Sequence, residues 1–196
     1  MAIDNYSSHL LVLEKILTSF PVNDVLEFGM GKYSTPFFAA RCKSVVSIEQ
    51  ESKEWYEKTA AEVTSSNWEP LFECNPAMVF DHFDKMGRRF DLVFSDGSPA
   101  TRYLVANQAM RRNVPFVVLH DAEKVWYYRW NLLEIPEQYY RFNFRRREGS
   151  PKTTTILSNT GDEVIDKWEI TGHDRVLHAY SGPQQPIVEV ILTKDQ

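Results

Sequence analysis

Acidic residues lie in or directly after four short apolar runs of the sequence. Glu27 precedes the turn that begins at Gly29, whereas Glu49, Asp96 and Asp121 come at the ends of later runs. Open α/β sheets bind their ligands beyond the carboxyl ends of the parallel strands, where the strand order reverses. If the four runs are such strands, their acids surround one site, and this charge points to a cationic ligand.

Two glycines, Gly29 and Gly31, allow a tight turn after the first run and let a ligand approach the backbone closely. Glu49 follows Gly29 by 49 − 29 = 20 residues, the spacing at which an acid ending the next strand accepts hydrogen bonds from a ribose. The alternative is a solvated acid at the start of the following helix. We favour the ribose because strand, turn and helix occur in the required order.

The negative charge of Glu27 beside the glycine turn favours one of two candidate cofactors over the other. A dinucleotide would place its pyrophosphate at this turn, close to Glu27, and two like charges about 5 Å apart repel by roughly 3 kcal/mol at an effective dielectric constant of 20. Ser34 also stands where the third glycine of a GxGxxG motif would lie. S-adenosylmethionine (SAM) carries an ammonium and a sulfonium group and no phosphate, so the acids favour SAM.

Strands alternate with helices up to residue 120, a pattern that is typical of βαβ units and a parallel sheet. Residues 139–145 and 153–157 then predict an antiparallel hairpin whose turn spans 148–151, residues 160–185 an irregular segment, and residues 187–192 a last strand. The strands expected before the hairpin are 25–28, 44–48, 71–74, 90–94 and 114–119, and the expected helices are 7–20, 35–41, 51–63, 77–86 and 103–112.

We therefore predict one α/β domain over residues 1–196. Its expected architecture is a three-layer sandwich in which a mostly parallel sheet carries an antiparallel C-terminal hairpin or edge. The N-terminal helix (7–20) precedes a cofactor-binding core (21–125), and residues 126–196 supply the hairpin and a substrate-side extension.

Four segments resemble the motifs of class I SAM-dependent methyltransferases, which have a Rossmann-like fold. They are Val25–Gly31, Val45–Glu49, Phe90–Gly97 and Val117–Asp121. The resemblance follows a consistent order over residues 20–125, which makes it more specific than any single motif. It is closest to the O-methyltransferases that act on small molecules.

The resemblance implies roles for individual residues. Glu27, Gly29 and Gly31 would line the methionine end of the cofactor, Glu49 would hold the ribose, and Asp96 would lie near the transferred methyl group. Met30 and Ser34, in the same glycine turn, complete the expected cofactor-binding set.

Asp96, His120 and Asp121 are the expected catalytic residues. Asp96 and Asp121 are similar to the acids that bind a divalent metal in catechol-type O-methyltransferases, and two oxygen ligands suit Mg²⁺. Ala122 stands where those enzymes supply an amide ligand, so we favour a site without metal. Alternatively, His120 or Asp121 is a general base for the acceptor hydroxyl. A structural interpretation has equal weight: Asp121 caps a helix that begins at Ala122, and His120 only packs.

The composition excludes several classes of protein. The chain has 22 Lys and Arg residues against 27 Asp and Glu residues, and its net charge of −5 argues against binding to bulk nucleic acid. Two cysteines without a ligand spacing do not predict a disulfide scaffold or a structural zinc site. Residues 1–20 resemble neither a signal peptide nor a membrane span, so we expect a cytoplasmic protein without membrane contact.

The expected activity is methyl transfer from SAM to a small-molecule acceptor, at oxygen. The alternatives are a non-catalytic interaction module with the same fold and, third, a nicotinamide-dependent oxidoreductase. The aromatic run at residues 126–130 could cover the site or form the surface of a homo-oligomer, but we favour core packing.

Overall fold

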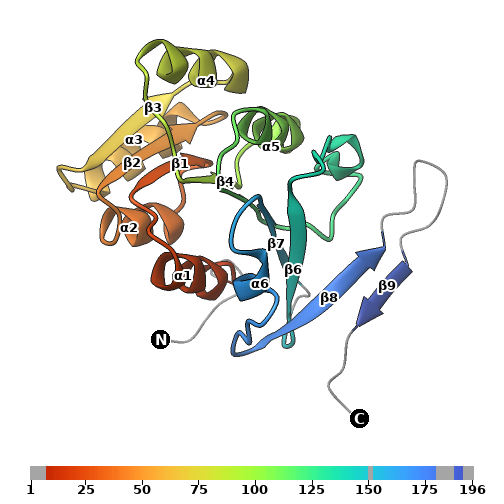
Figure 1. The fold of residues 1–196 in the computed structure, drawn as a ribbon. Coiled ribbons are helices and arrows are strands. Elements are labelled where there is room, and N and C mark those ends of the chain that lie inside the picture. The colour runs from red at the N-terminus through yellow and green to blue at the C-terminus, as the bar shows by residue number, and fades with distance from the viewer. Residues whose placement is uncertain (1–7, 150–151, 180–187, 192–196) are drawn as a thin grey trace.

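Nine strands form one sheet in the order β3-β2-β1-β4-β5-β7-β6-β8-β9 (Figure 1). The computed structural model describes residues 8–149, 152–179 and 188–191. The strands are β1 (Asp24–Phe28), β2 (Ser44–Glu49), β3 (Trp68–Phe72), β4 (Leu92–Ser95), β5 (Phe116–Leu119), β6 (Tyr140–Arg146), β7 (Thr153–Ser158), β8 (His173–Ala179) and β9 (Val188–Ile191). The helices are α1 (Leu10–Ser19), α2 (Ser34–Ala39), α3 (Lys53–Glu62), α4 (Pro76–Lys85), α5 (Arg102–Arg111) and α6 (Asp162–Ile165), with a 3₁₀ turn, η1 (Trp130–Leu132).

The first five strands are parallel, as predicted. β2 and β3 lie on one side of β1, and β4 and β5 lie on the other, so the strand order reverses next to β1. Crevices at such a reversal are where open α/β sheets bind ligands. The structure thus confirms the predicted reversal of strand order, and the carboxyl ends of these strands are the expected position of a ligand site.

The antiparallel part of the sheet is larger than predicted. The hairpin of β6 and β7 is confirmed, with β7 lying against β5, although residues 150 and 151 of the predicted turn lie outside the described residues. The prediction of an irregular segment over 160–185 is wrong for its described part, because it contains α6 and β8. β8 pairs with β6, which lies far from it in the sequence, and no local apolar run predicts this strand.

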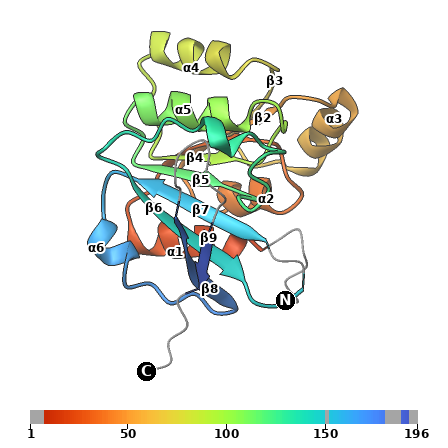
Figure 2. The same ribbon diagram turned by 90° about the vertical axis from the view of Figure 1, so that its right-hand side faces the viewer.

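Helices cover both faces of the sheet, which makes the predicted three layers (Figures 1 and 2). On one face, α1 and α2 bury Leu13, Ile16 and Phe38 against the sheet. On the opposite face, α4 and α5 bury Phe83 and Val105. Within the described ranges, no helix is both long and apolar enough to cross a membrane.

The turn after β1 is held against two neighbouring strands. Gly29 has a φ of +94°, and a Cβ atom there would lie 2.5 Å from the backbone carbon of Asp96 and the backbone nitrogen of Gly97. The Gly29 amide donates to the carbonyl of Ile48 at 2.8 Å, and the Asp96 amide donates to the carbonyl of Phe28 at 2.8 Å. Only glycine fits both the backbone angle and the space.

Glu27, which is fully buried in the sheet, stabilises the same turn through hydrogen bonds. Its Oε2 accepts hydrogen bonds from Thr35 Oγ1 at 2.7 Å and from Ser47 Oγ at 2.5 Å. Thr35 Oγ1 in turn accepts the Gly31 amide at 2.9 Å, so Glu27 is linked to the turn through one hydroxyl group. Burial raises the pKa of Glu27 from 4.5 to about 7, against the opposing effect of these hydroxyl donors.

We expect Gly29→Ala to destabilise the protein severely. Overpacking costs typically 1–3 kcal/mol, and a non-glycine residue in the left-handed region adds roughly 1 kcal/mol. The matched control is Gly87→Ala, since Gly87 has a φ of +68° but nothing within 4 Å of a Cβ atom. Urea unfolding of both variants checks this, and equal losses of stability would contradict the close approach at Gly29.

The raised pKa of Glu27 predicts a specific pH dependence of folding. Between pH 4.5 and about 7 the unfolded chain releases a proton that the folded protein retains, so stability falls as pH rises through this window. The shift corresponds to roughly 3 kcal/mol. We expect this loss in the wild type and not in Glu27→Gln, measured as urea unfolding free energies at both ends of the window. The same pH dependence in both proteins would be evidence against it.

Candidate active site

A cavity of about 830 Å³ opens at the carboxyl ends of the parallel strands. This volume lies within the range of about 300–1,000 Å³ that is typical of small-molecule sites. Its walls come from the start of α1, the glycine turn, the start of α3, the ends of β4 and β5, and the segments around Tyr128 and Lys152. The lining residues are His9, Gly31, Lys32, Tyr33, Ser34, Trp55, Asp96, Arg102, His120, Asp121, Lys124, Tyr128 and Lys152.

Five of the predicted site residues line this cavity, namely Gly31, Ser34, Asp96, His120 and Asp121. The other four predicted residues, Glu27, Gly29, Met30 and Glu49, are not among the lining residues. Glu27 and Gly29 lie in and under the turn, where they fix its shape. The structure therefore brings the expected catalytic residues together at the cavity, whereas four members of the expected cofactor-binding set do not line it.

Glu49 ends β2 and is almost fully buried. Its Oε1 accepts the backbone amides of Glu51 at 2.8 Å and Ser52 at 3.0 Å. Both hydrogen bonds described for this side chain use Oε1. They hold the carboxylate against the two backbone amides that directly precede α3. The alternative of a solvated acid at the start of the helix is wrong about solvation, because Glu49 is buried, although its Oε1 does accept the two amides that precede α3.

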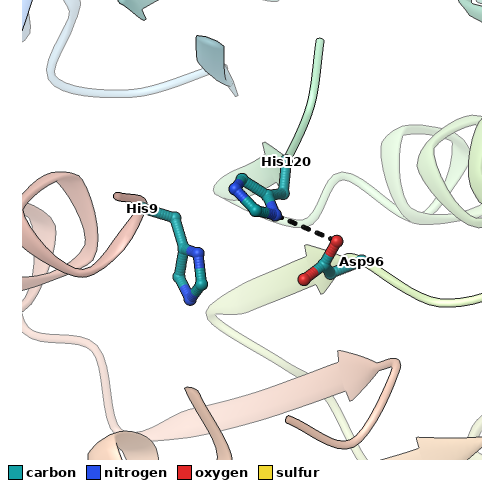
Figure 3. A group of neighbouring side chains, drawn as sticks. All are labelled: His9, Asp96 and His120. Atoms are coloured by element: carbon teal, nitrogen blue, oxygen red, sulfur yellow. Dashed lines mark hydrogen bonds and ion pairs between the residues drawn. The ribbon is translucent and has the colours of Figure 1, made fainter. Parts of the chain in front are cut away.

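Asp96 and His120 form a hydrogen-bonded pair at the ends of β4 and β5. His120 Nδ1 lies 3.0 Å from Asp96 Oδ1 (Figure 3). Arg102 Nη2 lies 2.9 Å from the same oxygen. Burial opposes ionisation of Asp96, but the neighbouring His120 and Arg102 outweigh it and hold the pKa of Asp96 well below its usual range. Burial likewise disfavours the imidazolium of His120, yet Asp96 raises the pKa of His120 above 6.5.

Asp121 is held in a backbone conformation that few non-glycine residues adopt. Its φ is +55°, in the left-handed region, where strain of order 1–3 kcal/mol is found mostly at functional sites. Lys152 Nζ pairs with Asp121 Oδ1, and the Tyr128 hydroxyl donates to Oδ2 at 3.0 Å. The Ala122 amide donates to the carbonyl of Thr153, and no α-helix begins there. The helix-capping interpretation of Asp121 is therefore wrong.

His9, which directly precedes α1, reaches the same cluster. Its ring packs edge-on against His120, with centroids 4.5 Å apart, and against Phe94 at 5.0 Å. Both ring nitrogens are buried without a hydrogen-bond partner in the described part of the chain, an arrangement that costs roughly 1–3 kcal/mol when nothing compensates it. Burial, with a smaller contribution from His120, lowers the pKa of His9 to about 3, so the ring is neutral at pH 7.

Cations from the protein itself pair with the two acids at the rim. The sequence predicts that Asp96 and Asp121 favour a cationic ligand, but Arg102 and Lys152 already neutralise these carboxylates. Lys32 and Lys124 also line the cavity. The attraction of the cavity for a positive charge is therefore weaker than the sequence predicts, because the local pairing cannot be read from acids alone.

Four lining residues of chemical interest were not predicted from the sequence: His9, Trp55, Arg102 and Lys152. Tyr128, which belongs to the aromatic run considered as a cover of the site, also lines the cavity. Arg102 follows Asp96 by 102 − 96 = 6 residues at the start of α5, a spacing that could have indicated it. Trp55 Nε1 donates to the carbonyl of Met30 at 2.6 Å, which holds this lining residue beside the glycine turn. His9 and Lys152 reach the site only through the tertiary fold, so no local signal marks them.

The aromatic segment 126–130 is divided between the core and the surface. Tyr128 and Trp130 are buried, as predicted. Trp126 and Tyr127 are 75% and 64% exposed, so the packing prediction is wrong for these two. The difference follows from the turns at this segment, which has no single helical or strand face to bury all four rings.

Solved structures of O-methyltransferases share this fold. The O-methyltransferase from Bacillus cereus in complex with S-adenosylhomocysteine (SAH) is 14% identical, with a TM-score of 0.64 over 81% of this chain and 84% of that chain. TomG from Streptomyces achromogenes, an O-methyltransferase of tomaymycin synthesis in complex with SAM, is 19% identical, with a TM-score of 0.60 over 82% of each chain. Neither the family models nor the curated proteins gave a match. The chain thus has the fold of class I SAM-dependent methyltransferases, as its motifs imply.

Proposed function

We propose that this protein transfers the methyl group of SAM to a hydroxyl group of a small molecule. The observation that carries the proposal is the cavity at the reversal of strand order, which joins the glycine turn to Asp96, His120 and Asp121. The two O-methyltransferases described above have the same fold and contain SAH or SAM, which supports this choice of cofactor.

The residues around the glycine turn fit SAM. Gly31 and Ser34 line the cavity, and Trp55 presents an indole ring beside them. The two hydrogen bonds described for Glu49 use Oε1, and we assign its Oε2 to accept a ribose hydroxyl at the end of β2. Glu27 and Gly29 contribute indirectly, because they hold the glycine turn in its conformation. Bound SAM supplies a methyl group activated by the sulfonium.

Asp96, His120 and Asp121 make up the acceptor side of the site. Methyl transfer to oxygen requires the acceptor to be positioned in line and to lose its proton. His120 and Asp96 lie together at the wall of the cavity, and Asp121 is fixed by Lys152 and Tyr128. We assign the positioning and the loss of the acceptor proton to these groups.

The proposal extends to the whole described chain. Tyr128 and Lys152 come from residues 126–196, which supports the assignment of this part as a substrate-side extension of one domain. The net charge of −5 favours a small molecule over bulk nucleic acid as acceptor. Cys42 and Cys74 are both free thiols, which fits a reducing compartment such as the cytoplasm.

We expect transfer of radioactive methyl from SAM to a hydroxyl-bearing acceptor in a mixed panel of small phenols and hydroxy acids. Asp96→Asn should lower the rate at least about 100-fold, as expected when a group that acts in the transition state is removed. A matched control is Asp81→Asn, an exposed acid on α4. SAM binding without transfer to any acceptor would instead support the non-catalytic interaction module.

We expect Glu49→Ala to weaken SAM binding roughly 10–100-fold, because a hydrogen bond to a charged acceptor contributes about 1.5–3 kcal/mol. Isothermal titration of the variant and the wild type with SAM measures the difference. Glu54→Ala, an exposed acid in the first turn of α3, is the control and should bind as the wild type does. If Glu49→Ala binds SAM as tightly as the wild type, the ribose assignment is wrong.

A further inference from the structure

Three potential metal ligands converge at the wall of the cavity. His9 comes from the start of α1, Asp96 from the end of β4 and His120 from the end of β5 (Figure 3). One ligand atom from each residue lies within 4.8 Å of the other two. Such a cluster becomes a metal site when each side chain is both oriented and free to donate a lone pair.

His9 is the member of the cluster that the fold leaves unexplained. The residue is 2% exposed, and neither ring nitrogen has a hydrogen-bond partner among the residues that the structure describes. Packing alone would be served by a phenyl ring, since the neighbours of His9 include the rings of Phe94 and His120. A metal ion bound to one ring nitrogen would give this buried imidazole the polar partner that it lacks.

The other two members are oriented as metal ligands usually are. His120 points Nδ1 at Asp96, while its Nε2 lies 3.4 Å from Ser8 Oγ and 3.8 Å from Asp121 Oδ1. Metal-binding histidines typically donate their second ring N–H to a carboxylate or another acceptor. Arg102 holds Asp96 through both the carboxylate and the backbone carbonyl, as outer groups hold ligating carboxylates.

We propose that His9, Asp96 and His120 bind one divalent transition-metal ion. Two imidazoles and one carboxylate suit Zn²⁺, Co²⁺ or Ni²⁺, whereas Mg²⁺ prefers oxygen ligands alone. This set differs from the Asp96 and Asp121 pair considered from the sequence. Lys152 and Tyr128 use both carboxylate oxygens of Asp121, whereas the side-chain contacts described above for Asp96, with His120 and Arg102, both use Oδ1. The ion would replace the direct hydrogen bond between His120 and Asp96 and keep its remaining positions for ligands from the cavity.

The proposed metal site gives a chemical reason why His9, Asp96 and His120 lie together on the acceptor side of the cavity. A bound divalent ion orients an oxygen ligand and lowers the pKa of its proton, so a hydroxyl-bearing acceptor would bind there as its anion. This catalytic role rests on the proposed function. Metal binding itself does not, and it can be measured without SAM or an acceptor.

The test is titration of the chelator-treated, full-length protein with Co²⁺, followed by visible absorption, and with Zn²⁺, followed by calorimetry. We expect one ion per chain. His9→Phe keeps the ring that packs against Phe94 and removes the nitrogens, and it should weaken binding at least about 100-fold, more than the loss of an outer-shell group typically does. His82→Phe, at an exposed histidine of α4, is the control and should bind as the wild type does.

Two results would overturn the metal site. One is the absence of stoichiometric Co²⁺ or Zn²⁺ binding by the wild type, which would leave His120 and Asp96 as a simple hydrogen-bonded pair. The other is metal binding by a different set of ligands. That set would be revealed by Co²⁺ or Zn²⁺ binding that survives in His9→Phe, or by binding that requires Asp121 and favours Mg²⁺. Circular dichroism and SAM titration of His9→Phe show whether the variant folds and keeps its cofactor pocket. SAM binding without metal binding would reject the metal site and leave the proposed function intact.

Discussion

The register of β1, β4 and β5 fixes the site. Phe28 pairs with Ser95, and Ser95 pairs with Leu119, so the three strands end at the same level. The ladder continues one residue farther, where the Asp96 amide donates to Phe28 and the His120 amide donates to Ser95. A shift by one residue would turn these side chains to the opposite face of the sheet. The positions of Asp96 and His120 at the carboxyl edge depend on this pairing.

Burial of acids next to that edge imposes the second constraint. An unpaired carboxylate inside a protein is costly, so it must find a cation, find hydroxyl donors or take up a proton. Asp96 and Asp121 are paired with Arg102 and Lys152, whereas Glu27 relies on hydroxyl donors and has a raised pKa. His9, in contrast, is a buried polar side chain whose ring nitrogens have no hydrogen-bond partner within the described ranges, and this contrast is the basis for the metal proposal.

Most of the parallel half of the fold could be predicted from the sequence, because four of its five strands are local apolar runs between helices. The bounds predicted for the third strand, 71–74, are wrong: β3 is Trp68–Phe72, a segment of mixed polarity that is only partly buried. The runs 25–28, 44–48 and 114–119 contain most of β1, β2 and β5. β8 could not be predicted, since its residues are mixed in polarity and gain their hydrogen bonds from β6, far away in sequence. For the same reason, motifs located Asp96, His120 and Asp121 but not His9 or Lys152, which only tertiary packing brings to the cavity.

The central claim is that the cavity over the glycine turn is a SAM site, and a crystal structure of the protein grown with SAH tests it most directly. The account predicts ligand density with the methionine end beside Gly31, Ser34 and Asp96, and with the ribose hydroxyls on Glu49. Density for SAH at another place on the protein, or crystals grown at saturating SAH whose cavity holds no ligand, would contradict it.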